Sequence, residues 1–202
     1  MTKFIKCRIL EASESKKKLK DIPRGQTFEY CGREWIVLEH DNNNHTLVLS
    51  NDIIGKMPFD KNNSNNWTKS TLREYLNDEF LEQMCAGLHP SDLGFFSIAT
   101  DLTSDDGLKD YGESIDTVSL LTCDLYRKHR DILEPIDKYW WLATPYFPVS
   151  ANDGYVCYVN TSGSLSSSSA CSWNGGVRPI CCLDSDVLVE TSKENSNGKE
   201  EF

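Results

Sequence analysis

The spacing of apolar positions changes along the chain, and each change predicts a different element. Residues 4–10 alternate weakly between apolar and polar, which favours an edge strand. Residues 28–38 form two strand-like runs separated at Gly32 and predict a hairpin, and residues 46–50 predict a third strand. We therefore expect residues 4–50 to form a small antiparallel meander.

Two segments have the period of an amphipathic helix. The first begins with a predicted capping box at residues 71–74, and its apolar stripe continues to Met84 before Gly87 ends it. The second begins after Thr122, a plausible N-cap, and its apolar face continues to Leu133. These two segments are the main helices that the sequence predicts.

Short strands and turns follow from Trp140 onwards. Residues 155–160 predict a strand that turns back after residues 161–164. Residues 176–183 predict a final strand, but it contains Pro179, which a central position of a sheet does not tolerate. We therefore expect this strand to lie at an edge or to contain a bulge.

The mixture of strands and helices, with no regular βαβ alternation, predicts an α+β fold. It would have small antiparallel sheets, two main helices and a loop-rich carboxy-terminal half. The length of 202 residues suits one domain, predicted over residues 1–189, with the meander up to residue 50 and a core over 51–189. Residues 190–202 are polar and acidic and are predicted to form a disordered tail.

The net charge of −10 argues against nucleic acid or an anionic membrane as the main partner, because both attract cationic surfaces. The amino terminus lacks an apolar stretch of signal-peptide length, and no segment is long enough to span a membrane. We therefore expect a cytoplasmic or virion-associated protein.

The eight cysteines include no Cys-x-x-Cys pair, and the four histidines show no spacing that would join them in a zinc site. Buried free thiols are the simpler expectation, and we predict no metal site. The acidic stretch from Asp101 to Glu113 resembles a loose Ca²⁺ loop around Gly107, but it lacks the EF-hand spacing. A solvated insertion is the favoured interpretation, and bound Ca²⁺ is the alternative.

Several blocks occur in the order seen in a bacterial and phage domain family of unknown function, so the chain resembles that DUF6273-like family over residues 28–184. The blocks are Ile53–Phe59, Trp67 with Ser70–Phe80, Val118–Thr122, Trp140–Pro145, Tyr158–Leu165 and Gly176–Pro179. Ala143 stands where the family usually has arginine. The resemblance implies a C-type-lectin-like fold, related in architecture to formylglycine-generating enzymes and to the variable proteins of diversity-generating retroelements.

Large and charged residues within these blocks are expected to build the scaffold. Arg178 on the final strand could bind an acidic ligand, but we favour a buried guanidinium that bonds several carbonyls or a carboxylate. The predicted structural residues are Trp67, Arg73, Trp141 and Arg178.

Recognition is expected between residues 146 and 174, where tyrosine, serine, glycine and asparagine are frequent. This mixture is typical of binding surfaces that combine aromatic anchors with adaptable hydroxyls, and the alternative is an ordinary surface loop. Adenine-directed diversification of residues 152–174 is a further hypothesis. The predicted ligand-binding residues are Tyr146, Asn152, Asp153, Tyr155, Tyr158, Asn160, Ser166, Ser168, Ser172, Trp173 and Asn174.

Catalytic motifs are absent: the chain has no nucleophile elbow, phosphate loop or dinucleotide fingerprint. The sequence therefore predicts a non-enzymatic recognition domain without a cofactor, which binds a protein or glycan on a cell surface. One alternative is an intracellular protein-interaction module. Another is an oxidase that uses Cys157 and Cys171, which could approach each other across the predicted hairpin.

Overall fold

The computed structural model describes residues 16–147, 154–171 and 174–191, and strands dominate it. The largest sheet has eight strands in the order β1-β15-β2-β3-β4-β14-β6, and β9 also pairs with β14. Its strands are β1 (Lys16–Lys18), β2 (Thr27–Tyr30), β3 (Arg33–His40), β4 (His45–Ser50), β6 (Phe95–Phe96), β9 (Val118–Leu120), β14 (Pro179–Asp184) and β15 (Leu188–Thr191).

A second sheet has five strands in the order β12-β11-β10-β13-β5, and a third is a two-stranded ribbon. The five strands are β5 (Gly55–Met57), β10 (Trp140–Pro145), β11 (Tyr155–Val159), β12 (Leu165–Ser169) and β13 (Gly175–Val177). The ribbon pairs β7 (Ile98–Asp101) with β8 (Glu113–Asp116).

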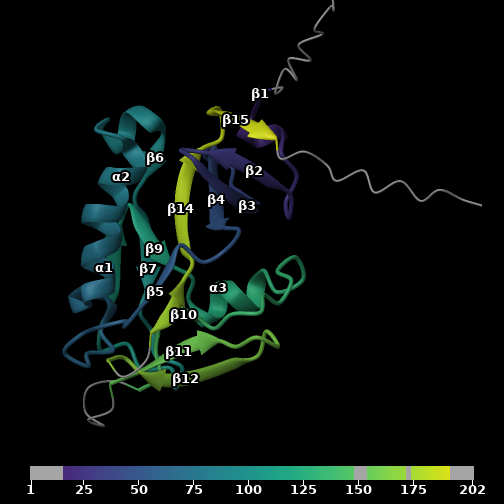
Figure 1. The fold of residues 1–202 in the computed structure, drawn as a ribbon. Helices are drawn as coiled ribbons and strands as arrows, with labels where there is room; N and C mark the ends of the chain where they lie inside the picture. Colours follow the sequence, from purple (N-terminus) through teal and green to yellow (C-terminus); the bar gives the residue numbers. More distant parts are fainter. Residues whose placement is uncertain (1–15, 148–153, 172–173, 192–202) are drawn as a thin grey trace, which may run out of the picture.

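Helical structure is limited. One continuous segment consists of α1 (Thr71–Tyr75), a π-helical turn (Leu76–Phe80) and α2 (Leu81–Cys85), and α3 (Cys123–Lys128) is short. Three 3-10 turns occupy Leu19–Asp21, Trp67–Lys69 and Pro90–Leu93. In Figure 1 the α1–α2 segment lies along one side of the molecule, and α3 lies between the eight-stranded sheet and the β11–β12 hairpin.

The structure is therefore mostly β, and the predicted α+β, C-type-lectin-like fold with two main helices is wrong. The carboxy-terminal half is not loop-rich either, because the described part of residues 140–191 carries six strands, β10 to β15. Many of these strands are short, so alternation extends over too few positions to be distinguished from a loop. The return strand predicted after residues 161–164 is present as β12, in which the serines at 166–169 pair with β11.

The amino-terminal hairpin is confirmed. Strand β2 pairs with β3 from Thr27↔Ile36 to Tyr30↔Arg33, and the turn residues Cys31 and Gly32 both have positive φ, 49° and 68°. Two consecutive residues of positive φ suit a tight two-residue hairpin turn. The third strand is β4, which pairs with β3. Residues 4–10, which we predicted to form an edge strand, lie outside the described residues.

The first helix begins one residue earlier than the predicted capping box. The hydroxyl of Ser70, rather than that of Thr71, accepts a hydrogen bond from the amide of Arg73 at 3.1 Å. The Thr71 hydroxyl instead accepts the amide of Lys61 at 3.2 Å. The helical segment ends where predicted, because Ala86 and Gly87 both adopt positive φ.

The predicted final strand is two strands that belong to different sheets. Strand β13 lies in the five-stranded sheet, and β14 lies between β4 and β9 in the eight-stranded sheet. The chain crosses from one sheet to the other at Arg178, and Pro179 is the first residue of β14. Our expectation of an edge or a bulge is thus wrong: a proline is also tolerated at the first position of a strand.

Two hydrophobic cores meet at β10, whose side chains alternate between them. Trp141 and Ala143 pack into the larger core, and Trp140 and Leu142 pack into the smaller one. Successive residues of a strand point to opposite faces, so a strand buried on both faces is apolar throughout. All six residues of β10 are buried. The strand therefore belongs to both cores.

The two ends of the described chain lie side by side. Strand β15 pairs with β1 through Lys16↔Glu190 and with β2 through Glu190↔Glu29. Residues 190 and 191, which we assigned to the tail, are thus part of a sheet. Within the described ranges, no helix has the length and apolar character needed to cross a membrane.

Candidate functional site

Two surface cavities share Asp105 in their walls, and we call them the Asp105 cavities. The first, about 440 Å³, lies between the segment 99–107 and α3. The second, about 290 Å³, lies beside β11 and β12. Besides Asp105, the first is lined by Ala99, Asp101, Thr103, Ser104, Gly107, Thr122, Cys123, Asp124, Leu125, Arg127, Lys128 and Thr144, and the second by Tyr146, Cys157, Leu165, Ser166 and Ser167.

Asp105 is held from two sides. Its amide donates to the carbonyl of Pro145 at 3.0 Å, which ties the loop to the end of β10. Its carboxylate forms an ion pair with Arg127 at 3.0 Å, and Arg127 also bonds Asp124 at 2.9 Å. The loop turns at Gly107, whose amide donates to the Ser104 carbonyl at 2.8 Å and whose φ of +91° favours glycine. The carboxylate is therefore directed to the boundary between the cavities.

Two buried thiols lie behind this carboxylate. Cys123 is the first residue of α3, and Cys157 lies on β11; only 2% and 3% of their surfaces are exposed. The two sulfur atoms and a carboxylate oxygen of Asp105 all lie within 4.8 Å of one another. The first turn of α3, the strand β11 and the 101–107 loop thus place three potential metal ligands around one point.

The start of α3 fixes Cys123. The Thr122 hydroxyl accepts the amide of Leu125 at 3.2 Å, which confirms the predicted N-cap. The Cys123 amide donates to the hydroxyl oxygen of Thr144 on β10 at 2.8 Å. The backbone of Cys123 is therefore fixed to the strand that separates the two cores.

The thiols interact with each other as well. A hydrogen bond from Cys157 lowers the pKa of Cys123 despite its burial, and the Thr144 hydroxyl acts in the same direction. The same hydrogen bond to Cys123, together with burial, raises the pKa of Cys157. Cys123 is accordingly the thiol that ionises first, with the Cys157 S–H donating to its sulfur.

Sequence reasoning missed this group because its members are far apart in the chain and match no ligand spacing. We considered Cys157 together with Cys171, but the thiol within reach of Cys157 is that of Cys123. Cys171 is exposed, and its amide donates to the side chain of Asn63 at 3.3 Å. The sequence did contain a signal for these two thiols. Cys157 lies at an inward-facing position of a predicted strand, and Cys123 directly follows the predicted N-cap Thr122.

Two of the predicted ligand-binding residues, Tyr146 and Ser166, line the second Asp105 cavity. Ser168 is half-buried, and its register partner is Val156. Tyr155 is 43% exposed, and Asn174 is exposed. Among the described members of the predicted set, Tyr146 and Ser166 thus share one cavity wall.

Other members of the predicted set have local structural contacts. Tyr158 packs edge-on against Trp141, with ring centroids 6.4 Å apart. The side-chain oxygen of Asn160 accepts the amides of Ser162 at 2.9 Å and Ser164 at 3.1 Å, so this side chain closes the β11–β12 turn. Asn152, Asp153, Ser172 and Trp173 lie outside the described residues.

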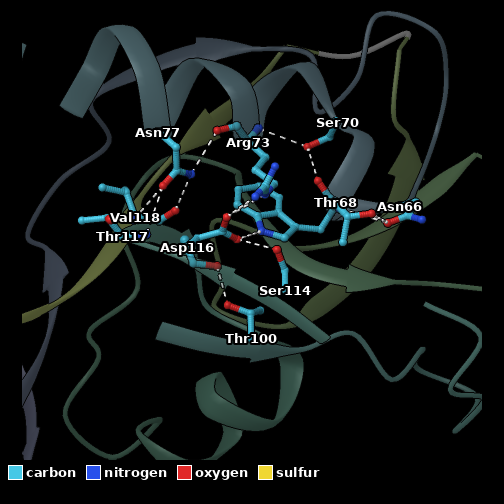
Figure 2. Close-up of polar contacts among 12 residues, drawn as sticks. Asn66, Thr68, Ser70, Arg73, Asn77, Thr100, Ser114, Asp116, Thr117 and Val118 are labelled. Carbon is cyan, nitrogen blue, oxygen red and sulfur yellow. Dashed lines mark hydrogen bonds and ion pairs between the residues drawn. The ribbon is translucent and has the colours of Figure 1, made fainter. Parts of the chain in front are cut away.

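The predicted structural residues Trp67 and Arg73 converge on Asp116, whose side chain is 1% exposed. Figure 2 shows this network, in which Asp116 also accepts the hydroxyl of Ser114 at 2.7 Å. Asn77 extends the network by bonding the carbonyl of Val118 at 2.9 Å. The helical segment and the β8–β9 chain are thus joined by buried and half-buried polar contacts.

Trp141 and Arg178 are buried too. The indole of Trp141 donates to the carbonyl of Met57 at 3.0 Å. Arg178 donates to the carbonyls of Ser50 at 2.8 Å and Asn51 at 3.0 Å, and its guanidinium lies 5.1 Å from the centre of the Trp140 ring. Burial lowers the pKa of Arg178 to about 10. Its donors are directed at backbone carbonyls of the scaffold.

The acidic stretch does not converge on an all-oxygen site. Asp101 accepts the amide of Thr103 at 2.9 Å and its hydroxyl at 2.6 Å, so this carboxylate closes its own turn. Among the residues that the structure describes, the potential metal ligands grouped around Asp105 are the two thiols. A thiol-rich set of donors does not suit Ca²⁺, which takes oxygen ligands.

No curated protein and no solved structure matches this chain. One family model does match part of the chain, from β7 to just beyond β14. The matched part contains Asp105, Cys123 and Cys157 but not the block from Trp67 to Phe80. Residues 100–185 match the family described as Domain of unknown function (DUF6273).

Proposed function

We propose that the chain is a non-enzymatic recognition domain that binds a polar ligand, a glycan or a short peptide, at the Asp105 cavities. The observation that carries this proposal is the junction of two cavities at one ion-paired carboxylate. Ligand sites are concave and contain a few converging polar groups, as these cavities do. Tyr146 and Ser166, from the segment predicted to recognise the ligand, are among the lining residues.

The chemistry of the walls favours a ligand of low net charge. Aspartates at 101, 105 and 124 are offset by Arg127 and Lys128. Most of the other polar groups are hydroxyls, which both donate and accept hydrogen bonds. Tyr146 adds an aromatic surface at the second cavity. Hydroxyl groups beside an aromatic ring suit a sugar or a polar peptide better than a polyanion.

Strand β12 offers a matched pair of variants to test this site. Ser167 is opposite Cys157 in the register and lines the second cavity, whereas Ser168 is opposite Val156 and is not among the lining residues. Directly opposite residues of antiparallel strands share a face. Ser167→Gln would therefore fill the cavity, while Ser168→Gln adds the same atoms on the opposite face.

The labelled full chain and both variants are tested on a glycan panel, on intact bacterial cells and by capture from a lysate, with melting temperatures measured alongside. Specific binding that is lost in Ser167→Gln and kept in Ser168→Gln supports the proposal. Capture of one intracellular protein with this same dependence identifies a protein ligand. Equal binding by both variants, or none by the unaltered chain, rejects the site.

Phage origin and retroelement diversification of residues 152–174 stay predictions within this proposal. They are tested on nucleic acid rather than on the protein. A template repeat near the coding sequence, differing mainly at adenines, would support diversification, and its absence from the complete genome would contradict it.

A further inference from the structure

Asp105, Cys123 and Cys157 present one oxygen and two sulfur atoms to a common point between α3, β11 and the 101–107 loop. We propose that these three side chains bind a thiophilic divalent metal ion, of which Zn²⁺ is the type, and leave a fourth position open toward the Asp105 cavities. This proposal goes beyond ligand recognition and does not depend on it.

The spacing of the donors suits such an ion. Zinc–sulfur and zinc–oxygen bonds are about 2.3 and 2.0–2.2 Å long, so neighbouring ligands in a tetrahedral site are about 3.3–3.8 Å apart. The three donor atoms already lie within 4.8 Å of one another. Small side-chain rotations would close the site without moving β11 or the first turn of α3.

Ligand type selects the class of metal. Two thiolates favour zinc and other thiophilic ions over Ca²⁺ and Mg²⁺, which prefer oxygen ligands. Three protein ligands with an accessible fourth position are typical of zinc sites that hold water or substrate, whereas purely structural sites have four protein ligands. Cys123 lines the first cavity and Cys157 the second, so that fourth position can be reached from solvent.

Charge balance supports a divalent ion. Binding would remove the protons of both thiols, and two thiolates with one carboxylate carry three negative charges. A divalent cation supplies two positive charges, and Arg127, which pairs with Asp105 at 3.0 Å and with Asp124 at 2.9 Å, offsets part of the remaining charge.

Neighbouring groups already orient the ligands. The Thr144 hydroxyl accepts the amide of Cys123, and the Pro145 carbonyl accepts the amide of Asp105. Both partners belong to β10, which is buried along its whole length. Such supporting contacts determine metal affinity because they hold the ligands before the ion arrives.

A disulfide between Cys123 and Cys157 is the competing state of this pair. A disulfide would not involve the carboxylate of Asp105, whereas a metal ion would be bound by this carboxylate together with the two sulfurs. We therefore favour metal coordination, and the two states are separable by mass, because a disulfide removes two hydrogens and a bound ion adds its own mass.

The test uses the full chain, purified under reducing conditions, stripped of metal and titrated with Co²⁺ and then Zn²⁺. We expect one ion per chain by native mass spectrometry and the visible and near-ultraviolet bands of thiolate-bound Co²⁺. Cys123→Ser and Cys157→Ser should abolish these bands, and Asp105→Asn should weaken binding by roughly tenfold or more. Cys171→Ser, at an exposed cysteine, should bind as the unaltered chain does.

Asp105→Asn keeps this test independent of folding, because it alters a surface loop and leaves both thiols in place. Absence of thiolate–Co²⁺ bands in the reduced, folded chain would overturn the proposal. So would binding that survives both cysteine substitutions, or a Cys123–Cys157 disulfide that re-forms in air while Zn²⁺ is present in excess. None of these readouts involves the ligand of the recognition domain.

Discussion

Asp116 and Arg73 form an ion pair in which one carboxylate oxygen lies 2.7 Å from Nε and 2.6 Å from a terminal guanidinium nitrogen of the arginine. The other carboxylate oxygen accepts the indole of Trp67 at 2.9 Å and the hydroxyl of Ser114 at 2.7 Å. Four donors thus surround one buried carboxylate (Figure 2). The pair fixes the helical segment against β8, because its two members come from these two elements.

Asp116→Ala should destabilise the protein strongly. The substitution leaves the guanidinium of Arg73 and the indole of Trp67 without their acceptor, and removing one partner of a buried ion pair costs about 3–5 kcal/mol. Urea denaturation followed by fluorescence measures the free energy of unfolding. Asp124→Ala, which breaks the exposed Asp124–Arg127 pair, is the control and should change it by no more than about 0.5 kcal/mol. Equal losses in both variants would contradict the role of Asp116.

Gly176→Ala should separate the strands on either side of β13. A Cβ atom at this position would lie 2.5 Å from the carbonyl oxygen of Tyr139 and 2.7 Å from a methyl group of Ile53. The backbone of Gly176 also donates to that carbonyl at 2.9 Å, so the chain at Tyr139 cannot withdraw without losing this hydrogen bond. We expect a loss of about 1–3 kcal/mol, the usual cost of overpacking.

Gly55 on the neighbouring strand β5 provides the matched control, because a Cβ atom there would meet nothing within 4 Å. Gly55→Ala should be neutral or stabilise by up to about 1 kcal/mol, since alanine restricts the unfolded chain. Melting temperatures of the two variants make the comparison. If Gly176→Ala melts no lower than Gly55→Ala, close approach of the backbones does not explain this glycine.

The sequence allowed us to predict turns and helix caps that depend on only a few neighbouring residues. The turn at Cys31–Gly32 and the N-cap Thr122 were predicted because glycine, threonine and the flanking apolar positions act over one turn of chain. The capping hydroxyl of Ser70 was missed by one residue, since Ser70 and Thr71 both offer a hydroxyl and tertiary contacts decide between them.

Long-range pairing was outside the reach of such rules. The residues near Pro179 do not indicate that Val177 pairs with Gly55 in one sheet and that Ile180 pairs with Leu49 in the other. The same limit hid the candidate metal site, because Asp105, Cys123 and Cys157 meet through sheet topology. The buried Arg178 was predicted from chemistry alone, since a guanidinium within apolar sequence needs acceptors, but its partners, the Ser50 and Asn51 carbonyls, could not be named.

His129 is 1% exposed, and its two ring nitrogens have different surroundings. Nδ1 lies 3.4 Å from a guanidinium nitrogen of Arg24. Arginine only donates, so we assign Nδ1 as the acceptor and place the proton on Nε2. Among the described residues Nε2 has no hydrogen-bond partner, and the nearest carboxylate oxygen of Glu39 is 3.7 Å away. Protonation would therefore place a second cation next to Arg24 in a buried position.

Burial lowers the pKa of His129 below 6.5, with Lys128 and Arg24 adding to this and Glu39 and Asp131 opposing it. The unfolded chain binds a proton near pH 6.5 and the folded chain only at lower pH, so the free energy of unfolding should fall as the pH drops below about 6.5. His129→Gln should reduce this slope between pH 7 and 5 by up to about 1.4 kcal/mol per pH unit. His89→Gln, at an exposed ring, should keep the original slope. Urea denaturation at several pH values in this range measures the free energy of unfolding. If it depends on pH equally in the unaltered chain and in His129→Gln, His129 is not the group whose protonation destabilises the fold.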